Sequence, residues 1–192
     1  MRLVVASRNE HKLRELADLL AGHEVVPLPE DVALPPETGA TFEANALPKA
    51  RAAARATGQV AFADDSGIEA AALGGAPGVR SARFAGEEAS DADNLARLIS
   101  EVPPGSALQY VCVIALVDPD RGKEHLFEGR CTGTMAPAPR GTGGFGYDPV
   151  FVPDDRDDGR TMAELTPAEK DAISHRGRAA RALAQRLCEE RP

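Results

Sequence analysis

The chain has 192 residues, of which 43% are hydrophobic and 27% charged, as in a soluble globular domain that buries about 70% of its unfolded surface. Its formal net charge of −8 repels a nucleic-acid backbone, no apolar run reaches the ~18 residues of a membrane span, and the short apolar start meets charge too early for a signal peptide. We therefore expect a cytoplasmic protein that binds neither nucleic acid nor membrane, with Cys112, Cys131 and Cys188 as buried thiols.

Hydrophobic spacing predicts strands and helices that alternate along the chain. In the first helix, Leu13, Leu16, Ala17 and Leu20 recur on one face. Prolines and glycines mark the loops between elements. The predicted elements, in chain order, are a strand at residues 2–6, a helix at 9–21, a proline-rich loop at 27–39, a helix at 41–57 that stops at Gly58, a strand from Val60, a turn at 74–78, a helix at 89–100, strands at 110–117 and 123–135, and a last helix from a capping box at Thr166.

This alternation indicates an α/β fold in a single domain with a mixed β-sheet. Clusters of glycine and proline at residues 74–78 and 136–149 indicate a cleft between two lobes.

An apolar run at residues 60–63 stops at two adjacent acids, Asp64 and Asp65, followed by Ser66. Hard divalent cations prefer carboxylate oxygen, so a buried strand that ends in paired acids indicates a metal site for phosphate chemistry. The alternative is a polar strand end followed by a turn or a helix cap.

The segment Ser7-Arg8-Asn9-Glu10-His11-Lys12 lies where a predicted strand gives way to a helix. Free backbone N–H groups, a hydroxyl, an amide and an ammonium group can converge on a phosphate at such a place. The alternative is a capping box formed by Ser7 and Glu10.

A glycine-rich loop at residues 141–149 contains Phe145, Gly146, Tyr147 and Asp148. Glycines let a ligand approach the backbone closely, and either aromatic ring could stack on a base, which makes the loop a candidate base pocket. A flexible turn with one ring in the core is the alternative. Further on, Lys170, Ser174, His175 and Arg176 offer donors to the exocyclic oxygen of a purine, or form a charged solvent face.

Several motifs follow one another in a fixed order: Ser7-x-Asn9-x-x-Lys12; Glu37-Thr38-Gly39 with Thr41-Phe42, Asn45-Ala46 and Lys49-Ala50; Ala63-Asp64-Asp65-Ser66-Gly67; Gly74-Gly75-Ala76-Pro77-Gly78 with Ser81-Ala82-Arg83; residues 143–149; and Glu169-Lys170 with Ser174-His175-Arg176. This set, which covers essentially the whole chain, resembles the Ham1-like inosine/xanthosine triphosphate pyrophosphatase family.

The resemblance implies a homodimeric enzyme that hydrolyses ITP, dITP and XTP to the monophosphate and pyrophosphate, with Mg²⁺ or alternatively Mn²⁺ as cofactor. It also implies an elongated mixed sheet flanked by helices, with the active site in a central cleft between two lobes. It gives Asp65 the activation of water, gives Lys49 an assisting role, and makes Asp64 and Asp65 metal ligands. Substrate contacts then fall to Ser7, Arg8, Asn9, Glu10, His11, Lys12, Ser66, Phe145, Gly146, Tyr147, Asp148, Lys170, His175 and Arg176. Donors such as the Arg176 guanidinium, or backbone N–H groups, would distinguish a 6-oxo purine from adenine.

One position departs from the family pattern, which has a metal-binding acid immediately before Asn45. Ala44 stands there, and Glu43 lies one residue earlier, about 100° away around a helix. Pro48 falls one turn later, and we expect a kink there to turn Glu43 toward the metal.

Three other functions stay open. The first is a nucleotide-binding protein with weakened hydrolysis because of Ala44, and the second is a non-catalytic interaction module. The third is a general nucleotide or phosphate-ester hydrolase on a similar scaffold.

Overall fold

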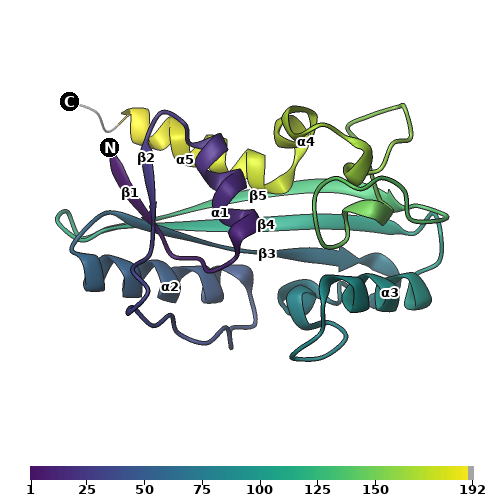
Figure 1. The fold of residues 1–192 in the computed structure, drawn as a ribbon, viewed down its shortest axis with the longest axis horizontal. Helices are drawn as coiled ribbons and strands as arrows, with labels where there is room; N and C mark the ends of the chain where they lie inside the picture. The colour runs from purple at the N-terminus through teal and green to yellow at the C-terminus, as the bar shows by residue number, and fades with distance from the viewer. Residues whose placement is uncertain (190–192) are drawn as a thin grey trace. The chain divides into compact units, whose positions relative to one another are not determined.

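The computed structural model describes residues 1–189 and shows an α/β fold built on a six-stranded sheet, in the order β2-β1-β3-β4-β5-β6 (Figure 1). β1 runs parallel to both β2 and β3, and β5 is antiparallel to β6, so the sheet is mixed as predicted. The strands are β1 (Arg2–Val5), β2 (Glu24–Pro27), β3 (Ala61–Ala70), β4 (Ala107–Asp118), β5 (Lys123–Met135) and β6 (Phe151–Pro153). The helices are α1 (Glu10–Leu19), α2 (Phe42–Thr57), α3 (Asp91–Glu101), α4 (Pro167–Ile173) and α5 (His175–Glu189).

The chain divides into two compact units. The first unit contains residues Met1–Asp65 and Cys112–Gly129, together with the C-terminal helix from Arg176, and the second contains Ser66–Val111 and Arg130–His175. β3, β4 and β5 therefore each continue from one unit into the other.

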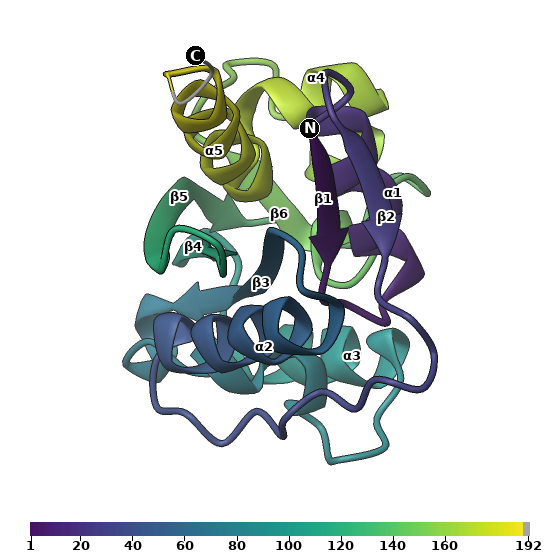
Figure 2. The same ribbon diagram turned by 90° about the vertical axis from the view of Figure 1, so that its left-hand side faces the viewer.

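In the first unit, helices cover both faces of the strands (Figures 1 and 2). Leu3 and Val5 of β1 pack in a cluster with side chains of α1 and α5. Val4 and Ala6 belong to a second cluster, with the alanines of α2. Successive strand residues point to opposite faces, so the alternation along β1 fixes which helix each side chain meets.

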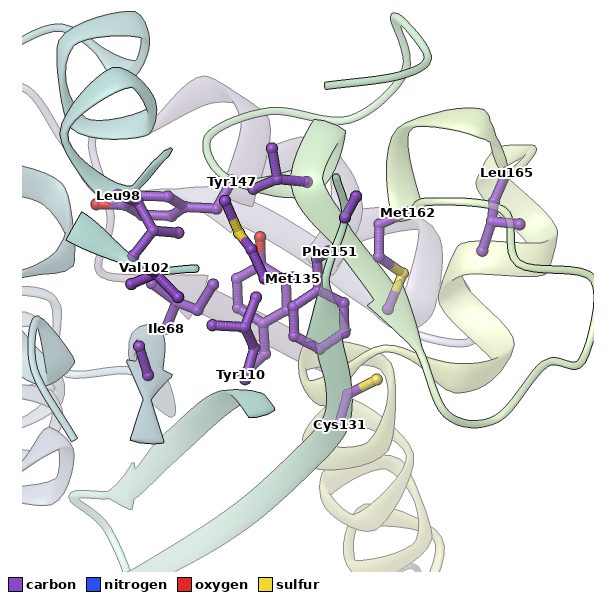
Figure 3. Close-up of a cluster of buried hydrophobic side chains, with 14 residues drawn as sticks. Ile68, Leu98, Val102, Tyr110, Cys131, Met135, Tyr147, Phe151, Met162 and Leu165 are labelled. Atoms are coloured by element: carbon purple, nitrogen blue, oxygen red, sulfur yellow. The ribbon is translucent and has the colours of Figure 1, made fainter. Parts of the chain in front are cut away.

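The second unit has a hydrophobic cluster of its own. It brings together side chains of β3, α3, β4, β5 and the segments around β6 (Figure 3). Tyr110 of β4 lies at its centre, with its ring centroid 4.5 Å from that of Phe151.

The predicted elements agree closely with the structure where local signals are strong. β5 has the predicted bounds, and α2 ends at Gly58, whose φ of 63° suits a left-handed cap. Ser174 divides the predicted last helix into α4 and α5. The short strands β2 and β6 are not among the predicted elements. Ala17 is exposed although it was placed on the buried face of the first helix.

Two predictions about the core are wrong. β3 does not end at the paired acids but continues through them to Ala70. Cys112 and Cys131 are buried as predicted, but Cys188 is exposed.

No helix within residues 1–189 is both long and apolar enough to cross a membrane.

Candidate functional site

Asp65 is a buried carboxylate held by α2. Asn45 on that helix donates from Nδ2 to Asp65 Oδ2 at 2.9 Å, and its own Oδ1 accepts the Gly39 N–H at 2.7 Å. Lys49, four residues further along the same helix, donates from Nζ to the backbone oxygen of Asp64 at 2.7 Å. Residues four apart lie on one face of a helix, so α2 presents an amide and an ammonium group together to β3.

Glu37 joins this group from the proline-rich loop. Its carboxylate accepts a hydrogen bond from Lys49 Nζ at 2.5 Å. Burial tends to lower the pKa of Lys49, but the negative charges of Asp64 and Glu37 outweigh burial and raise it, so Lys49 is a cation.

The pKa of Asp65 is raised. Burial is the main cause, the positive charges of Lys49 and Lys12 partly oppose it, and the negative charge of Glu37 adds to it. A carboxylate whose pKa lies above its ordinary value accepts a proton more readily, which suits a general base.

Asp64 lies in a different environment although it is the neighbouring residue. Lys12 Nζ of α1 lies 3.0 Å from its Oδ2, and Arg176 Nη2 of α5 lies 3.4 Å from the same oxygen. Arg176 also donates to Glu15 at 2.5 Å. Burial alone would raise the pKa of Asp64, but the charges of Lys12 and Arg176 outweigh it and lower the pKa well below its usual range. Asp64 is therefore ionised at neutral pH.

The two acids point to opposite faces of β3. Asp64 meets α1 and α5, whereas Asp65 meets α2, as strand alternation requires. Two cations already neutralise the Asp64 carboxylate, so it does not fit the predicted role of sharing one metal with Asp65.

The segment before α1 is organised by side chains. Asn9 is the N-cap, and its Oδ1 accepts the N–H groups of His11 and Lys12 at 3.0 and 3.1 Å. Ser7 Oγ accepts the Asn9 N–H at 3.2 Å, so the cap is not the box of Ser7 with Glu10 that the sequence allowed. Asn9 therefore uses two of the backbone donors that were expected to meet a phosphate.

Arg8, predicted to touch substrate, instead holds the proline-rich loop. Its guanidinium donates to the carbonyl oxygens of Leu28, Pro29, Glu30 and Val32 at 2.7 to 3.3 Å. Its side chain has a structural role here.

The second unit brings together a separate group of predicted residues around Asp148. The carboxylate of Asp148 accepts hydrogen bonds from Lys170 Nζ at 2.8 Å, the Phe145 N–H at 3.0 Å and the Tyr110 hydroxyl at 3.1 Å. Lys170 Nζ also lies 5.0 Å from the centroid of the half-buried Phe145 ring. Asp148 therefore holds a cation next to an aromatic ring, both of which are groups that can contact a planar ligand.

Tyr147 is placed differently from its prediction. Its ring is buried in the hydrophobic cluster (Figure 3), and its hydroxyl donates to the Ser81 carbonyl at 2.6 Å. Of the two rings in the glycine-rich loop, Phe145 is thus the candidate for stacking on a base. Gly144 is required beside it, because its φ is 68° and a Cβ there would overlap the Asp148 carboxylate.

His175 is buried in the same unit, and Ser66 and Gly146 are half-buried. The His175 ring stacks on Tyr110, with centroids 4.5 Å apart and planes inclined by 9°. The Gly146 N–H donates to Asp91 at 3.2 Å.

A model of the Ham1 family matches residues 3–186. The chain belongs to the Ham1 family. A dITP/XTP pyrophosphatase from Symbiobacterium thermophilum is 52% identical over 192 residues, covering 97% of this chain and 94% of that protein. Another, from Frankia alni, is 50% identical over 204 residues, covering 98% of each chain.

Solved structures of similar proteins share the fold of this chain. A HAM1 protein from Coxiella burnetii has a TM-score of 0.87 and 42% identity, covering 98% of this chain and 99% of that chain. A nucleoside-triphosphatase described as a dITP/XTP pyrophosphatase from Mycobacterium abscessus has a TM-score of 0.73 and 50% identity, covering 95% of this chain and 98% of that chain. The resemblance and the fold class predicted from the sequence are confirmed.

Within this Ham1 protein, Glu43 does not take the predicted place. α2 runs without interruption through Pro48, and Glu43 is exposed in its first turn. Glu43 precedes Asn45 by two residues, a rotation of about 200° on an ideal helix, so it faces away from Asp65. The predicted kink toward a metal is contradicted, and Ala44, one residue from Asn45, is likewise exposed.

Glu37 is the candidate site residue that sequence reasoning missed. The Glu37-Thr38-Gly39 motif belongs to the family resemblance, but a loop residue twelve positions before Lys49 gives no periodic signal of contact. Its negative charge acts on both Lys49 and Asp65.

Proposed function

We propose that this Ham1 protein hydrolyses dITP, ITP and XTP to the monophosphate and pyrophosphate, and so removes deaminated purines from the nucleotide pool. The observation that carries the proposal is the group formed by Asp65, Asn45, Lys49 and Glu37, called the Asp65 group, in a chain about 50% identical to dITP/XTP pyrophosphatases. In that group a buried carboxylate is held by Asn45 beside the ammonium of Lys49.

A divalent cation fits this group. Within residues 1–189 no three His, Cys, Asp or Glu side chains are clustered to hold a metal alone. Mg²⁺, however, is commonly held by one or two carboxylates together with substrate phosphates. Asp65 and Glu37 would supply these carboxylates. When bound, Mg²⁺, or alternatively Mn²⁺, would neutralise negative charge on the triphosphate.

The side chains of the chain account for the remaining chemistry. In the proposed reaction, water attacks the α-phosphorus, a new P–O bond forms, and the bond to the pyrophosphate oxygen breaks. Asp65 takes the proton that the water loses, as a raised pKa favours. Lys49 and Lys12 place positive charge near the triphosphate, which stabilises the charge that moves to pyrophosphate.

Phe145, Lys170 and Asp148 are proposed to bind the purine and ribose end. Lys170 is a donor, and a 6-oxo purine presents an acceptor where adenine presents an amino group. A site that hydrogen-bonds a particular group rejects an analogue that lacks it. Arg176 remains a second candidate donor, although Glu15 and Asp64 hold its guanidinium here.

We also propose, on the resemblance to this family, that the enzyme is a homodimer in the cytoplasm and that its active site lies in a central cleft. The small-molecule substrate follows from the same proposal.

The test is pyrophosphate release with excess Mg²⁺ from dITP, XTP, dATP and dGTP. We expect rapid release from the first two alone, reduced by about 10³-fold or more in Asp65→Asn, because the general base and a metal-binding oxygen are both impaired. Glu124→Gln, which alters an exposed acid of the same unit, is the control and should keep full activity.

Other outcomes separate the remaining functions. Equal release from all four nucleotides would indicate a general nucleotide hydrolase. Nucleotide binding without release would indicate a binding protein, and the absence of both would indicate an interaction module.

A further inference from the structure

Tyr110 of β4 joins two residues predicted to bind the nucleoside. The residue is 5% exposed, and its side chain lies in the hydrophobic cluster of the second unit (Figure 3). Nothing in the sequence motifs singles it out, since it sits in a continuous apolar strand. Its contacts nevertheless reach Asp148, 38 residues away, and His175.

The hydroxyl of Tyr110 completes the hydrogen bonding of Asp148. Lys170 Nζ and the Phe145 N–H both donate to Oδ2, whereas Tyr110 donates to Oδ1 at 3.1 Å. Bonds to both oxygens prevent rotation of the carboxylate about its last side-chain torsion. Because Asp148 in turn holds Lys170 and the backbone of Phe145, its orientation sets theirs.

The ring of Tyr110 supports His175. The two rings are nearly parallel, at 9°, with centroids 4.5 Å apart. A flat aromatic surface under an imidazole restricts the tilt of that ring.

A role in packing alone does not require the hydroxyl. A buried hydroxyl loses its hydration, and phenylalanine would fill the same volume without that cost. Burial, followed by the charge of Asp148, raises the pKa of Tyr110 well above its ordinary value, so the phenol stays a donor at every working pH.

We propose that Tyr110 is a positioning residue for nucleoside recognition, which fixes Asp148 through its hydroxyl and supports His175 with its ring. The inference rests on the proposed function, because Asp148 and His175 matter only if this unit binds the nucleoside. Tyr110 itself touches neither the triphosphate nor the reacting atoms in this proposal.

The main test uses Tyr110→Phe, which keeps the ring and removes only the hydroxyl. Steady-state pyrophosphate release gives kcat and KM for dITP and XTP, and calorimetry gives Kd for inosine monophosphate and for tripolyphosphate. We expect KM and the Kd of inosine monophosphate to rise about 5- to 20-fold, as loss of a hydrogen bond to a charged group implies. kcat should stay within about twofold and tripolyphosphate binding should not change, because only the nucleoside end is affected.

Leu98→Ala is the matched control. Leu98 is fully buried in the same cluster, so its truncation lowers stability without removing a bond to Asp148. It should lower Tm and leave KM unchanged. An equal rise of KM in Leu98→Ala, or an unchanged KM in Tyr110→Phe, would overturn the inference.

A second variant keeps the test decisive if Tyr110→Phe fails to fold. Asp148→Asn removes the charge that Tyr110 is proposed to orient, and it should raise KM with little loss of kcat. An unchanged KM in Asp148→Asn would refute the proposal that Tyr110 acts on nucleoside binding through Asp148. In the double variant, Tyr110→Phe should add less than about twofold, since residues in one network are not additive.

The readouts also separate the two proposals. If the wild type releases no pyrophosphate from dITP or XTP, the proposed function fails by itself. Binding of inosine monophosphate to the wild type and to Tyr110→Phe would still decide the role of Tyr110.

Discussion

Replacing Asp64 with asparagine tests the ion pairs that this residue of β3 forms with Lys12 and Arg176. Asp64→Asn keeps the shape of the side chain and removes its charge, which leaves Lys12 and Arg176 without their shared counter-ion. Lys12 Nζ is 3.0 Å from the carboxylate, and the side chains of Asp64 and Arg176 are 0% and 3% exposed. Breaking a buried pair of this kind costs about 3–5 kcal/mol. At about 2–4 °C per kcal/mol for a chain of this size, Tm should fall by about 6–20 °C.

The assay is thermal and urea unfolding of the metal-free protein in EDTA, with Glu124→Gln as control. Glu124 pairs with Arg51 at 2.6 Å, but both side chains are exposed, at 37% and 45%, so the control should cost at most about 1 kcal/mol. A cost for Asp64→Asn no larger than that of the control would refute the buried ion pairs.

Acid adds an independent test. The folded pKa of Asp64 is depressed, so its contribution to stability is complete above the unfolded value of about 3.9 and is lost as pH falls toward the folded pKa. In that range the unfolded chain binds a proton that the folded chain does not. The stability difference between wild type and Asp64→Asn should therefore be constant above about pH 5 and narrow below about pH 4, by up to about 1.4 kcal/mol per pH unit. A difference independent of pH would contradict a depressed pKa.

Two further predictions follow from the site. Gly144→Ala should raise KM for dITP by about tenfold or more, because its Cβ would overlap the Asp148 carboxylate. The control is Gly159→Ala, which should leave KM unchanged, because Gly159 has a similar positive φ of 66° but open space around it. Steady-state kinetics and Tm of both variants check this prediction. In a Mg²⁺ titration, Glu37→Gln should raise the Mg²⁺ concentration that gives half-maximal rate by about tenfold, and Glu43→Gln should not change it. An effect of Glu43→Gln alone would show that Glu43, and not Glu37, is the metal-binding carboxylate.

The sequence predicted elements well where the determining signal is local. The alanine-rich helix is bounded by the Thr41 cap and by the left-handed Gly58, both of which depend on a few neighbouring residues. The continuous apolar character of residues 110–117 likewise predicted a strand of the sheet interior, and all eight of these residues are buried in β4.

Prediction failed where distant residues decide the structure. Paired acids normally end a buried strand, but Arg176, 112 residues from Asp64, supplies one of the charges that let β3 continue. The prediction for Glu43 rests on its being adjacent in sequence to the expected acid, whereas Glu37 contacts Lys49 because of the path of a loop. Loop paths and buried counter-ions are tertiary facts that periodicity does not encode.

The alternation of β3 explains how two adjacent aspartates come to have opposite properties. Side chains of Asp64 and Asp65 leave the strand on opposite faces, so each meets different helices. Two cations keep Asp64 ionised, while burial raises the pKa of Asp65 against weaker opposition. Environments that push the pKa values of neighbouring carboxylates apart are how one site obtains both a fixed charge and a proton acceptor. A shift of one residue in the register of β3 would exchange the two faces and abolish both roles, which is why the surrounding alanines and Phe62, packed on their own faces, matter to the chemistry.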